Sequence, residues 1–283
     1  MGSSLAWKNR TAVISGGSNG LGRALALSLA KQAANLVIIG RDTNRLEAVE
    51  KQALEAGASS VAIVSMDVRE GSQDTNSHGA SQKDSLRDIL SVQGCDLLIN
   101  AIGKSDRGSL CQLSESDLVE QFGINVLATH AMTKLCWSAL CESRGTVVNI
   151  ASLAGIVAGP GMGGYSMAKH ALVGLHRQWR LEAESTGVHF LLVCPGPIAR
   201  DDSADRYADL VQARGLDPVS QSPGGGVALR RLDPDKLSLQ ILKAAEAGKL
   251  ELVVPGKARL LAVLAAFWPS LADSIIRKKM KRS

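Results

Sequence analysis

The sequence has few aromatic residues, 3% of the 283, and its five cysteines are scattered without any Cys-x-x-Cys pair. The odd number of cysteines argues against a disulfide framework and favours reduced thiols in a cytosol-like compartment. The five histidines lack the His-Glu-x-x-His spacing of metal-binding helices, so we expect no metal site. Because aromatic residues are scarce, the core must be packed mainly from Ala, Leu, Val and Ile.

Long apolar runs are also missing. The first ten residues lack the apolar segment of a signal peptide, and no run is long enough to span a bilayer. The net charge of +5 is compatible with anionic ligands or lipid surfaces. The basic residues are dispersed except at the end of the chain, and no aromatic-interleaved basic stripe indicates a nucleic-acid partner. We therefore expect a cytoplasmic protein that does not bind nucleic acid.

What is present is a regular alternation of short apolar runs with helical patterns. The runs are apolar on both faces, which is typical of parallel strands that helices cover on both sides. The expected strands are residues 11–15, 35–40, 60–66, 96–101, 146–151, 188–193 and 251–254. The expected helices are residues 20–32, 43–56, 83–90, 115–141, 165–185 and 234–247, and the polar residues 70–82 are expected to form an exposed loop.

This order predicts an α/β fold of the Rossmann type, with one doubly wound parallel sheet and helices on both faces. No internal linker is visible, so residues 1–283 are expected to form a single domain. Residues 199–233 are polar and rich in glycine. They form either a lid that orders over the ligands or an inert surface loop.

A glycine-rich loop, Ser15-Gly16-Gly17-Ser18-Asn19-Gly20-Leu21-Gly22, follows the first expected strand. Its glycines leave room for the backbone to approach a pyrophosphate and for the next helix to pack on the sheet. That helix offers free N–H groups and the positive end of its dipole. The spacing is not the Gly-x-Gly-x-x-Gly of many dinucleotide folds, and glycine-rich turns also occur for structural reasons.

Tyr165 and Lys169 lie four residues apart in an expected helix, and therefore share one face of it. A free tyrosine has a pKa of about 10 and is a poor acid or base at neutral pH, but a nearby cation lowers that pKa. The pair could then exchange a proton with a substrate oxygen. The pattern is common by chance, and its position after Ser152 and the glycine loop is what gives it weight.

Together these motifs resemble the short-chain dehydrogenase/reductase family over residues 11–255. The matching motifs occur in the family's order: the Gly16, Gly20 and Gly22 loop, Asp67-Val68, Asn100-Ala101-Ile102-Gly103, Asn125, Ser152, Tyr165 with Lys169, and Pro195-Gly196-Pro197-Ile198. Two departures stand out. The family commonly has Asn-Asn-Ala-Gly at the third of these motifs. It also often has, a few residues after Pro-Gly, a threonine that holds the cofactor carboxamide, where this chain has Ala199-Arg200-Asp201.

The resemblance implies an oxidoreductase that transfers a hydride between a nicotinamide cofactor and a carbonyl or alcohol substrate, and a homodimer or homotetramer. Tyr165 would give or take the proton on the substrate oxygen, and Lys169 would lower its pKa and hold the nicotinamide ribose. Ser152 would polarise the substrate carbonyl, and Asn125 would hold a water that links Lys169 to solvent. The structural alternatives are a strand-end cap for Ser152 and a helix-surface position for Asn125. A non-catalytic, cofactor-sensing protein on the same fold is the alternative function.

The resemblance also implies which residues contact the cofactor. Asp67 would meet the adenine amine, with Val68 packed on the ring, while Asn100 and Gly103 would line the adenosine side of the groove. The full expected set is Gly16, Ser18, Asn19, Gly20, Leu21, Gly22, Arg41, Asp67, Val68, Asn100, Ala101, Gly103, Tyr165, Lys169, Pro195, Gly196 and Ile198.

The end of the second strand predicts which cofactor is used. An acidic residue there accepts hydrogen bonds from a free ribose 2′-hydroxyl, but this chain has Gly40 followed by Arg41. A guanidinium suits a phosphate, so we favour NADP(H) over NAD(H). Asp42 keeps NAD(H) open, and Arg41 is alternatively a solvated charge at a helix start. Asn19 is not the basic residue that often gives NADP(H) enzymes a second phosphate contact, although Ser18 could donate a hydrogen bond.

The substrate is less well defined. Leu153, Ile156, Val157 and Met162 follow Ser152 and are apolar, which indicates either a hydrophobic ketone or alcohol, or simple packing. At the end of the chain, residues 258–268 are apolar and residues 277–282 are a basic run. This extension, residues 258–283, either docks on an anionic membrane surface with Phe267 and Trp268 at the interface, or packs on the pocket or a neighbouring subunit.

Overall fold

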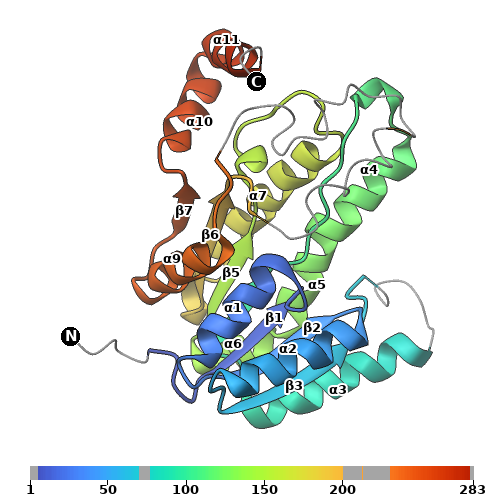
Figure 1. Cartoon of the computed structure of the whole chain (residues 1–283), viewed down its shortest axis with the longest axis vertical. Helices are drawn as coiled ribbons and strands as arrows, with labels where there is room; N and C mark the ends of the chain where they lie inside the picture. Colours follow the sequence, from blue (N-terminus) through green and yellow to red (C-terminus); the bar gives the residue numbers. More distant parts are fainter. Residues whose placement is uncertain (1–5, 70–76, 200–211, 213–229, 281–283) are drawn as a thin grey trace.

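One sheet of seven parallel strands organises the chain (Figure 1). The computed structural model describes residues 6–69, 77–199, 212 and 230–280. The strand order is β3-β2-β1-β4-β5-β6-β7, and each neighbouring pair is parallel. The strands are β1 (Thr11–Ser15), β2 (Asn35–Gly40), β3 (Ser60–Ser65), β4 (Leu97–Asn100), β5 (Thr146–Ile150), β6 (His189–Pro195) and β7 (Glu251–Val254). The doubly wound parallel sheet that the apolar runs predict is confirmed.

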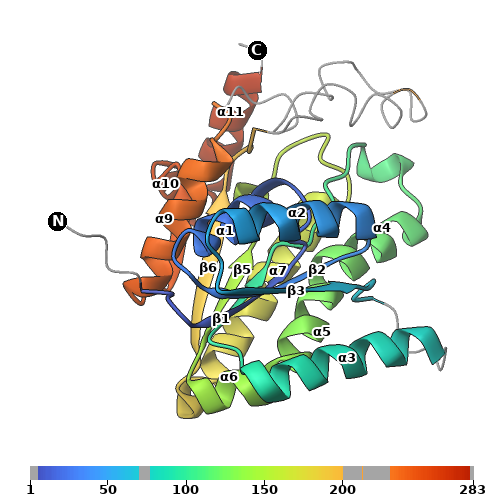
Figure 2. The same cartoon turned by 60° about the horizontal axis from the view of Figure 1, so that its bottom comes forward.

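Helices cover both faces of this sheet, as Figure 2 shows. One face carries α1 (Gly20–Ala30), α2 (Thr43–Glu55) and α9 (Pro234–Glu246). The other carries α3 (Ser77–Gln93), α5 (Ala128–Leu135), α6 (Trp137–Ser143) and α7 (Tyr165–Glu182), with α4 (Glu115–Phe122) ahead of α5. Because both faces are covered, the four inner positions of β2 and all of β4 are buried.

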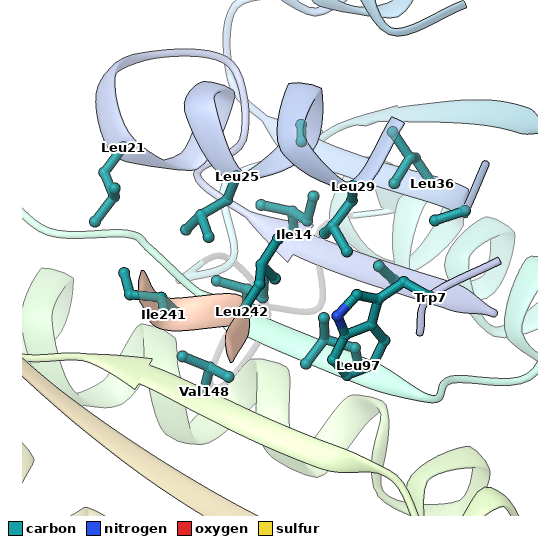
Figure 3. Close-up of a cluster of buried hydrophobic side chains, with 14 of the residues drawn as sticks. Trp7, Ile14, Leu21, Leu25, Leu29, Leu36, Leu97, Val148, Ile241 and Leu242 are labelled. Carbon is teal, nitrogen blue, oxygen red and sulfur yellow. The ribbon is translucent and has the colours of Figure 1, made fainter. Parts of the chain in front are cut away.

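The core under α1 shows how the sequence produces this packing (Figure 3). Leu21, Leu25 and Leu29 recur every four residues on α1, so they form one stripe that faces the sheet, and all are at most 4% exposed. They pack against strand residues such as Ile14, and the α9 leucine Leu242 closes the cluster. A hydrogen bond of 2.7 Å between the hydroxyls of Ser28 and Ser238 also joins α1 to α9.

Helix α3 begins at Ser77, whereas the sequence predicts a loop up to residue 82. That prediction is wrong, because the Ser- and Gly-rich composition masked the start of a 17-residue helix. Leu86 and Leu90 of α3 are buried against the sheet, and this packing outweighs the weak helix propensity of the segment before them.

The expected single helix over residues 115–141 is interrupted twice, so that prediction is also wrong. A π-helical segment, η2 (Gly123–Leu127), lies between α4 and α5. Helix α5 ends at Leu135, and Cys136 separates it from α6. A capping box at Ser114 and Asp117 starts α4 as its sequence would suggest. Single-turn π segments are frequent at functional sites, and Asn125 lies inside this one.

Two helices, α10 (Ala258–Phe267) and α11 (Pro269–Met280), follow β7. They pack on each other, and Figure 1 shows them beyond the end of β7. No residue of α10 is buried. Over the described residues, no helix combines the length and the apolar character that crossing a membrane requires.

Candidate active site

The glycine-rich loop lies where the strand order reverses, between β1 and β4, the usual ligand crevice of such sheets. Gly16 has a φ of +77°, and a Cβ there would lie 2.9 Å from the amide nitrogen of Ile102, so the loop packs directly on the turn after β4. A Cβ at Gly22 would collide with the Gly16 carbonyl. Asn19 caps α1 by accepting a 2.7 Å hydrogen bond from the Gly20 N–H, and the first turn of α1 has no acidic residue. This arrangement suits an anionic pyrophosphate.

A buried polar network holds the neighbouring strand ends together. Asn100 accepts a 3.1 Å hydrogen bond from the Ser15 hydroxyl and donates to Asn149 Oδ1 at 2.9 Å. Asn149 in turn contacts Nδ1 of His176 at 3.1 Å. The Asn100 side chain, 1% exposed, is therefore engaged within the sheet, while the turn that it begins, through Ala101 to Gly103, packs against the glycine loop.

The end of β2 brings together the residues that bear on cofactor choice. A Cβ at Gly40 would lie 2.9 Å from the Ser18 hydroxyl, so an acidic side chain has no room there unless Ser18 moves. Asp42 caps α2 through the Arg45 N–H and pairs with the Arg45 guanidinium at 3.1 Å. The Arg41 side chain remains 71% exposed, with its guanidinium 3.8 Å from Asp67.

Asp67 lies at the carboxyl end of β3 and faces two arginines. Arg69 makes the closer pair, with hydrogen bonds from its Nε and an N–O distance of 2.6 Å at its terminal nitrogen. The hydrogen bonds from Arg69 lower the pKa of the Asp67 carboxyl from its usual value, and the charge of Arg41 acts in the same direction. Val68 beside it is buried.

Lys169 is a charged residue of the site that is almost fully buried. Its side chain is 3% exposed, and Nζ donates a 3.0 Å hydrogen bond to the Ile150 carbonyl at the end of β5. Nζ also lies 5.8 Å from the centre of the Tyr165 ring, one turn earlier on α7. Burial lowers the pKa of Lys169 to about 8. The helical spacing thus brings the two predicted side chains together.

Asn125 reaches the same place from η2. Its amide nitrogen donates 3.0 Å hydrogen bonds to the carbonyls of Lys104 and Gln121, while the buried Oδ1 has no partner among the described residues. A Cβ at Gly103 would lie 2.9 Å from that Oδ1 and 3.2 Å from Lys169 Nζ, so both polar atoms face the space beside Gly103. The sequence expectation that Asn125 holds a water beside Lys169 fits this unpaired oxygen.

Ser152 caps the short turn η3 (Leu153–Gly155), its hydroxyl accepting a 3.1 Å hydrogen bond from the Ala154 N–H. Since the oxygen accepts this bond, its O–H can still donate to a ligand. The turn packs on α7. A Cβ at Gly155 would lie 2.6 Å from the Lys169 carbonyl, and the Ser166 hydroxyl donates to the Ala154 carbonyl at 2.8 Å. The turn that Ser152 begins is thereby packed on α7 at Ser166 and Lys169.

Sequence reasoning missed Asp106, which is 3% exposed. Its carboxylate accepts a 3.2 Å hydrogen bond from the N–H of Gly164, the residue immediately before Tyr165, and another at 2.8 Å from the Arg107 N–H. Gly163 has a φ of +54°, and a Cβ there would clash with the same carboxylate. Asp106 therefore fixes the start of α7. Nothing in the sequence pattern distinguishes this buried acid from an exposed one.

The remaining predicted residues lie on the segments after Ser152 and after β6. Leu153, Ile156, Val157 and Met162 are all partly buried. After β6, the Gly196 N–H donates to the Val254 carbonyl at 2.7 Å, and Ile198 pairs with Leu232. The rest of the predicted lid, residues 200–211 and 213–229, lies outside the described residues. In the ranges that are described, no group of three or more His, Cys, Asp or Glu side chains could hold a metal ion.

Comparison with known proteins agrees with this geometry. A family model described as short chain dehydrogenase matches residues 10–210. Similar proteins include "Dehydrogenase/reductase SDR family member 7" of Homo sapiens (32% identity, 65% of this chain and 54% of that protein) and of Mus musculus (28%, 74% and 61%). "Ketoacyl reductase HetN" of Nostoc sp. is 32% identical over 68% of this chain and 64% of that protein. The chain thus spans less than two thirds of the length of each of these relatives.

A solved structure is similar in fold. It is an alcohol dehydrogenase from the archaeon Thermococcus sibiricus complexed with 5-hydroxy-NADP, with a TM-score of 0.67 over 86% of this chain and 95% of that one. At 24% identity, this likeness concerns the fold alone. The family match covers well over half of the chain and includes the glycine loop, Ser152, Tyr165 and Lys169. The chain belongs to the short-chain dehydrogenase family.

Proposed function

We propose that the protein is an oxidoreductase that reduces an apolar carbonyl compound, or oxidises the corresponding alcohol, with NADP(H) as cofactor and Tyr165 as the general acid or base. The observation that carries this proposal is that Asn125 and Lys169 face one space beside Gly103, with the Tyr165 ring near Lys169. The turn that Ser152 begins packs on the same part of α7. This site lies at the carboxyl edge of the sheet, next to the glycine loop.

The residues around the crevice fit a nicotinamide dinucleotide. The loop from Gly16 to Gly22 would hold the pyrophosphate at the start of α1, and Asp67 with Val68 would meet the adenine. The turn from Asn100 to Gly103 and the segment from Pro195 to Ile198 would line the rest of the groove. When bound, the nicotinamide supplies a hydride to the carbonyl carbon.

The proton is handled by the side chains of this chain. The Tyr165 hydroxyl gives its proton to the substrate oxygen, and the Ser152 O–H donates a hydrogen bond to that oxygen. With a pKa of about 8, Lys169 is mostly protonated at neutral pH, and its charge stabilises the Tyr165 phenolate that remains. A water on Asn125 Oδ1 would then return a proton towards Lys169 from solvent.

The preference for NADP(H) is supported by the end of β2. Asp42, which would favour a free ribose hydroxyl, already caps α2 and pairs with Arg45. The exposed Arg41 guanidinium and the Ser18 hydroxyl are both close to the position after β2 where a 2′-phosphate would lie. A guanidinium donates paired, charge-assisted hydrogen bonds to a phosphate.

The apolar character of the substrate is supported by Leu153, Ile156, Val157 and Met162, which lie on the segment between Ser152 and Tyr165. We also propose a homodimer or homotetramer, since Val119, Phe122 and Leu127 are exposed large hydrophobic residues on consecutive turns of α4 and η2. Sedimentation analysis of the purified chain tests the subunit number.

A screen of apolar ketones and alcohols, followed by the absorbance of NADPH, tests the activity. We expect turnover of at least one class of apolar carbonyl compound, and its loss in Tyr165→Phe. Tight NADPH binding without turnover of any compound would instead favour a cofactor-sensing protein on this fold.

A further inference from the structure

The two C-terminal helices carry an apolar surface that is open to solvent. It consists of five large side chains with exposed fractions between 47% and 71%: Leu260, Val263, Phe267, Trp268 and Leu271. The first three recur at i, i+3 and i+7, so they share one face of α10. The Phe267 and Trp268 rings lie 6.0 Å apart at the junction with α11, where Leu271 continues the patch. We call these five residues the C-terminal apolar surface.

The net positive charge of the chain is concentrated in the C-terminal segment that carries this surface. Residues 257–283 contain seven Lys or Arg and one acidic residue, Asp273. Removing them from the 32 basic and 27 acidic residues of the whole chain leaves residues 1–256 with a net charge of −1. The net positive charge of the protein therefore resides in its last 27 residues. Lys257 and Arg259 at the start of α10, and Arg277 and Lys278 near the end of α11, are all exposed.

This combination identifies the partner by its chemistry. Exposed Leu, Val, Phe and Trp side chains flanked on both sides by lysine and arginine are typical of helices that lie in the headgroup region of an anionic bilayer. Tryptophan in particular prefers that interface. A second copy of the chain would present the same cluster of positive charge, and the two clusters would repel each other.

The helix that carries most of this surface starts at the edge of the sheet where the candidate active site lies. β7 ends at Val254, whose carbonyl accepts the hydrogen bond from Gly196 in the segment assigned to the cofactor. Helix α10 begins four residues later, at the same edge of the sheet as Tyr165 and the glycine loop. We propose that the C-terminal apolar surface docks the protein on an anionic lipid surface, with its apolar side chains in the headgroup–acyl boundary and the flanking basic residues on lipid phosphates. Docking in this way turns the carboxyl edge of the sheet towards the membrane.

Vesicle sedimentation of the full-length chain tests this proposal. We expect binding to mixed phosphatidylcholine–phosphatidylglycerol vesicles at low salt, little binding to phosphatidylcholine alone, and weaker binding as salt shortens the screening length to about 10 Å at 0.1 M. Trp268 is the one exposed tryptophan among the four, so its emission should shift to shorter wavelength on docking. Equal binding to both vesicle types, or none at low salt, would overturn the proposal.

Matched variants separate the contribution of the apolar side chains to lipid binding from that of the basic side chains. Phe267→Glu with Trp268→Glu should abolish sedimentation, whereas Val92→Glu, at an 85% exposed position on α3, should not change it. Arg277→Glu with Lys278→Glu should weaken binding by on the order of tenfold or more, since each basic residue near an anionic surface contributes about 1 kcal/mol. Lys31→Glu with Lys51→Glu makes the same charge change at exposed positions just after α1 and on α2. This control should weaken vesicle binding much less.

Two further readouts keep the result interpretable. All variants should retain the circular dichroism spectrum and turnover of a small ketone in solution, because none of these residues lies in the candidate active site. If the Phe267 and Trp268 double variant instead lowers the sedimenting mass in the absence of vesicles, and the parent chain does not bind lipid, the surface joins two copies of the chain and the membrane proposal is wrong.

Discussion

Lys169 and Arg41 are both basic residues at the carboxyl edge of the sheet, yet one is 3% exposed and the other 71%. Lys169 is fixed by the Ile150 carbonyl, and burial alone lowers its pKa to about 8. Within the described part of the chain, the ion pair that Arg41 makes is a long one of 3.8 Å to Asp67, which Arg69 already holds more closely. The positive charge of Lys169 therefore has a fixed position and a lowered pKa, whereas the positive charge of Arg41 is on an exposed side chain that is free to change its orientation.

The difference has a physical reason. A group that sets the proton affinity of Tyr165 must keep one distance from it, so packing and a low dielectric are useful there. A group that binds a phosphate acts by charge and by donors that can turn towards it, and water does not prevent this. We expect substitutions at the buried end to change the rate of reaction, and substitutions at the exposed end to change which cofactor is bound.

The largest effect is expected at the buried end, from Tyr165→Phe. The ring and its packing beside Lys169 remain, but the proton donor is lost, so kcat should fall by about 10²–10⁴-fold. The dissociation constant for NADPH, measured by fluorescence titration, should change little. A variant that kept the activity of the parent on the same ketone would remove Tyr165 from the mechanism.

The features of the fold and the site that depend on local sequence could be predicted. The positions of Tyr165 and Lys169 follow from helical spacing, which is local, and the strands follow from apolar runs of the right length. The caps at Asn19 and Asp42 have the side chains expected at helix starts. The sequence expectation placed Asn19 in the cofactor loop and treated Asp42 only as the acid that keeps NAD(H) open.

Other features depend on distant contacts and could not be predicted. The hydrogen bond that the Gly164 N–H donates to Asp106 joins residues that are far apart in the chain. The π segment around Asn125 differs from an ordinary helix only in the register of its hydrogen bonds. The start of α3 was hidden because the sheet packing of Leu86 and Leu90 compensates for poor helix formers upstream. In each case tertiary packing overrides the local pattern.

At the exposed end, Arg41→Ala should weaken NADPH binding by about tenfold to a hundredfold, because a hydrogen bond to a charged group contributes roughly 1.5–3 kcal/mol. NADH binding should be almost unchanged. Arg45→Ala is the matched control, since Arg45 is a nearby exposed arginine that pairs with Asp42. Equal losses for both cofactors in the titration would mean that Arg41 does not contact a 2′-phosphate.

A smaller effect, on stability, is expected at the buried end of the site from a substitution at Gly163, which lies just before α7. Gly163→Ala places a Cβ against the Asp106 carboxylate at a φ of +54°. The left-handed conformation alone costs about 1–2 kcal/mol for an L-residue, so the free energy of unfolding should fall by at least that amount. Gly174→Ala, within α7 and with open space around it, should instead stabilise by roughly 0.5–1 kcal/mol. Chemical denaturation measures both, and a neutral Gly163→Ala would show that the start of α7 is adaptable.

The smallest effect concerns a second buried basic residue of α7, His176, whose pKa is lowered to about 3, chiefly by burial. The unfolded chain binds a proton at this imidazole below a pKa of about 6.5, while the folded chain does not, so stability falls as the pH drops through 6.5. Between pH 7.5 and 6.0 this lowers the free energy of unfolding by about 0.8 kcal/mol.

His176→Gln should lose that part of the pH dependence. Its effect on stability at pH 7.5 is separate, because Asn149 loses its Nδ1 partner there. His170→Gln, on the exposed side of the same helix, controls for removing an imidazole from α7. Denaturation curves at pH 7.5 and 6.0 measure the change in unfolding free energy for each protein. If that change were the same in His176→Gln as in the parent, burial would not be what keeps this imidazole neutral.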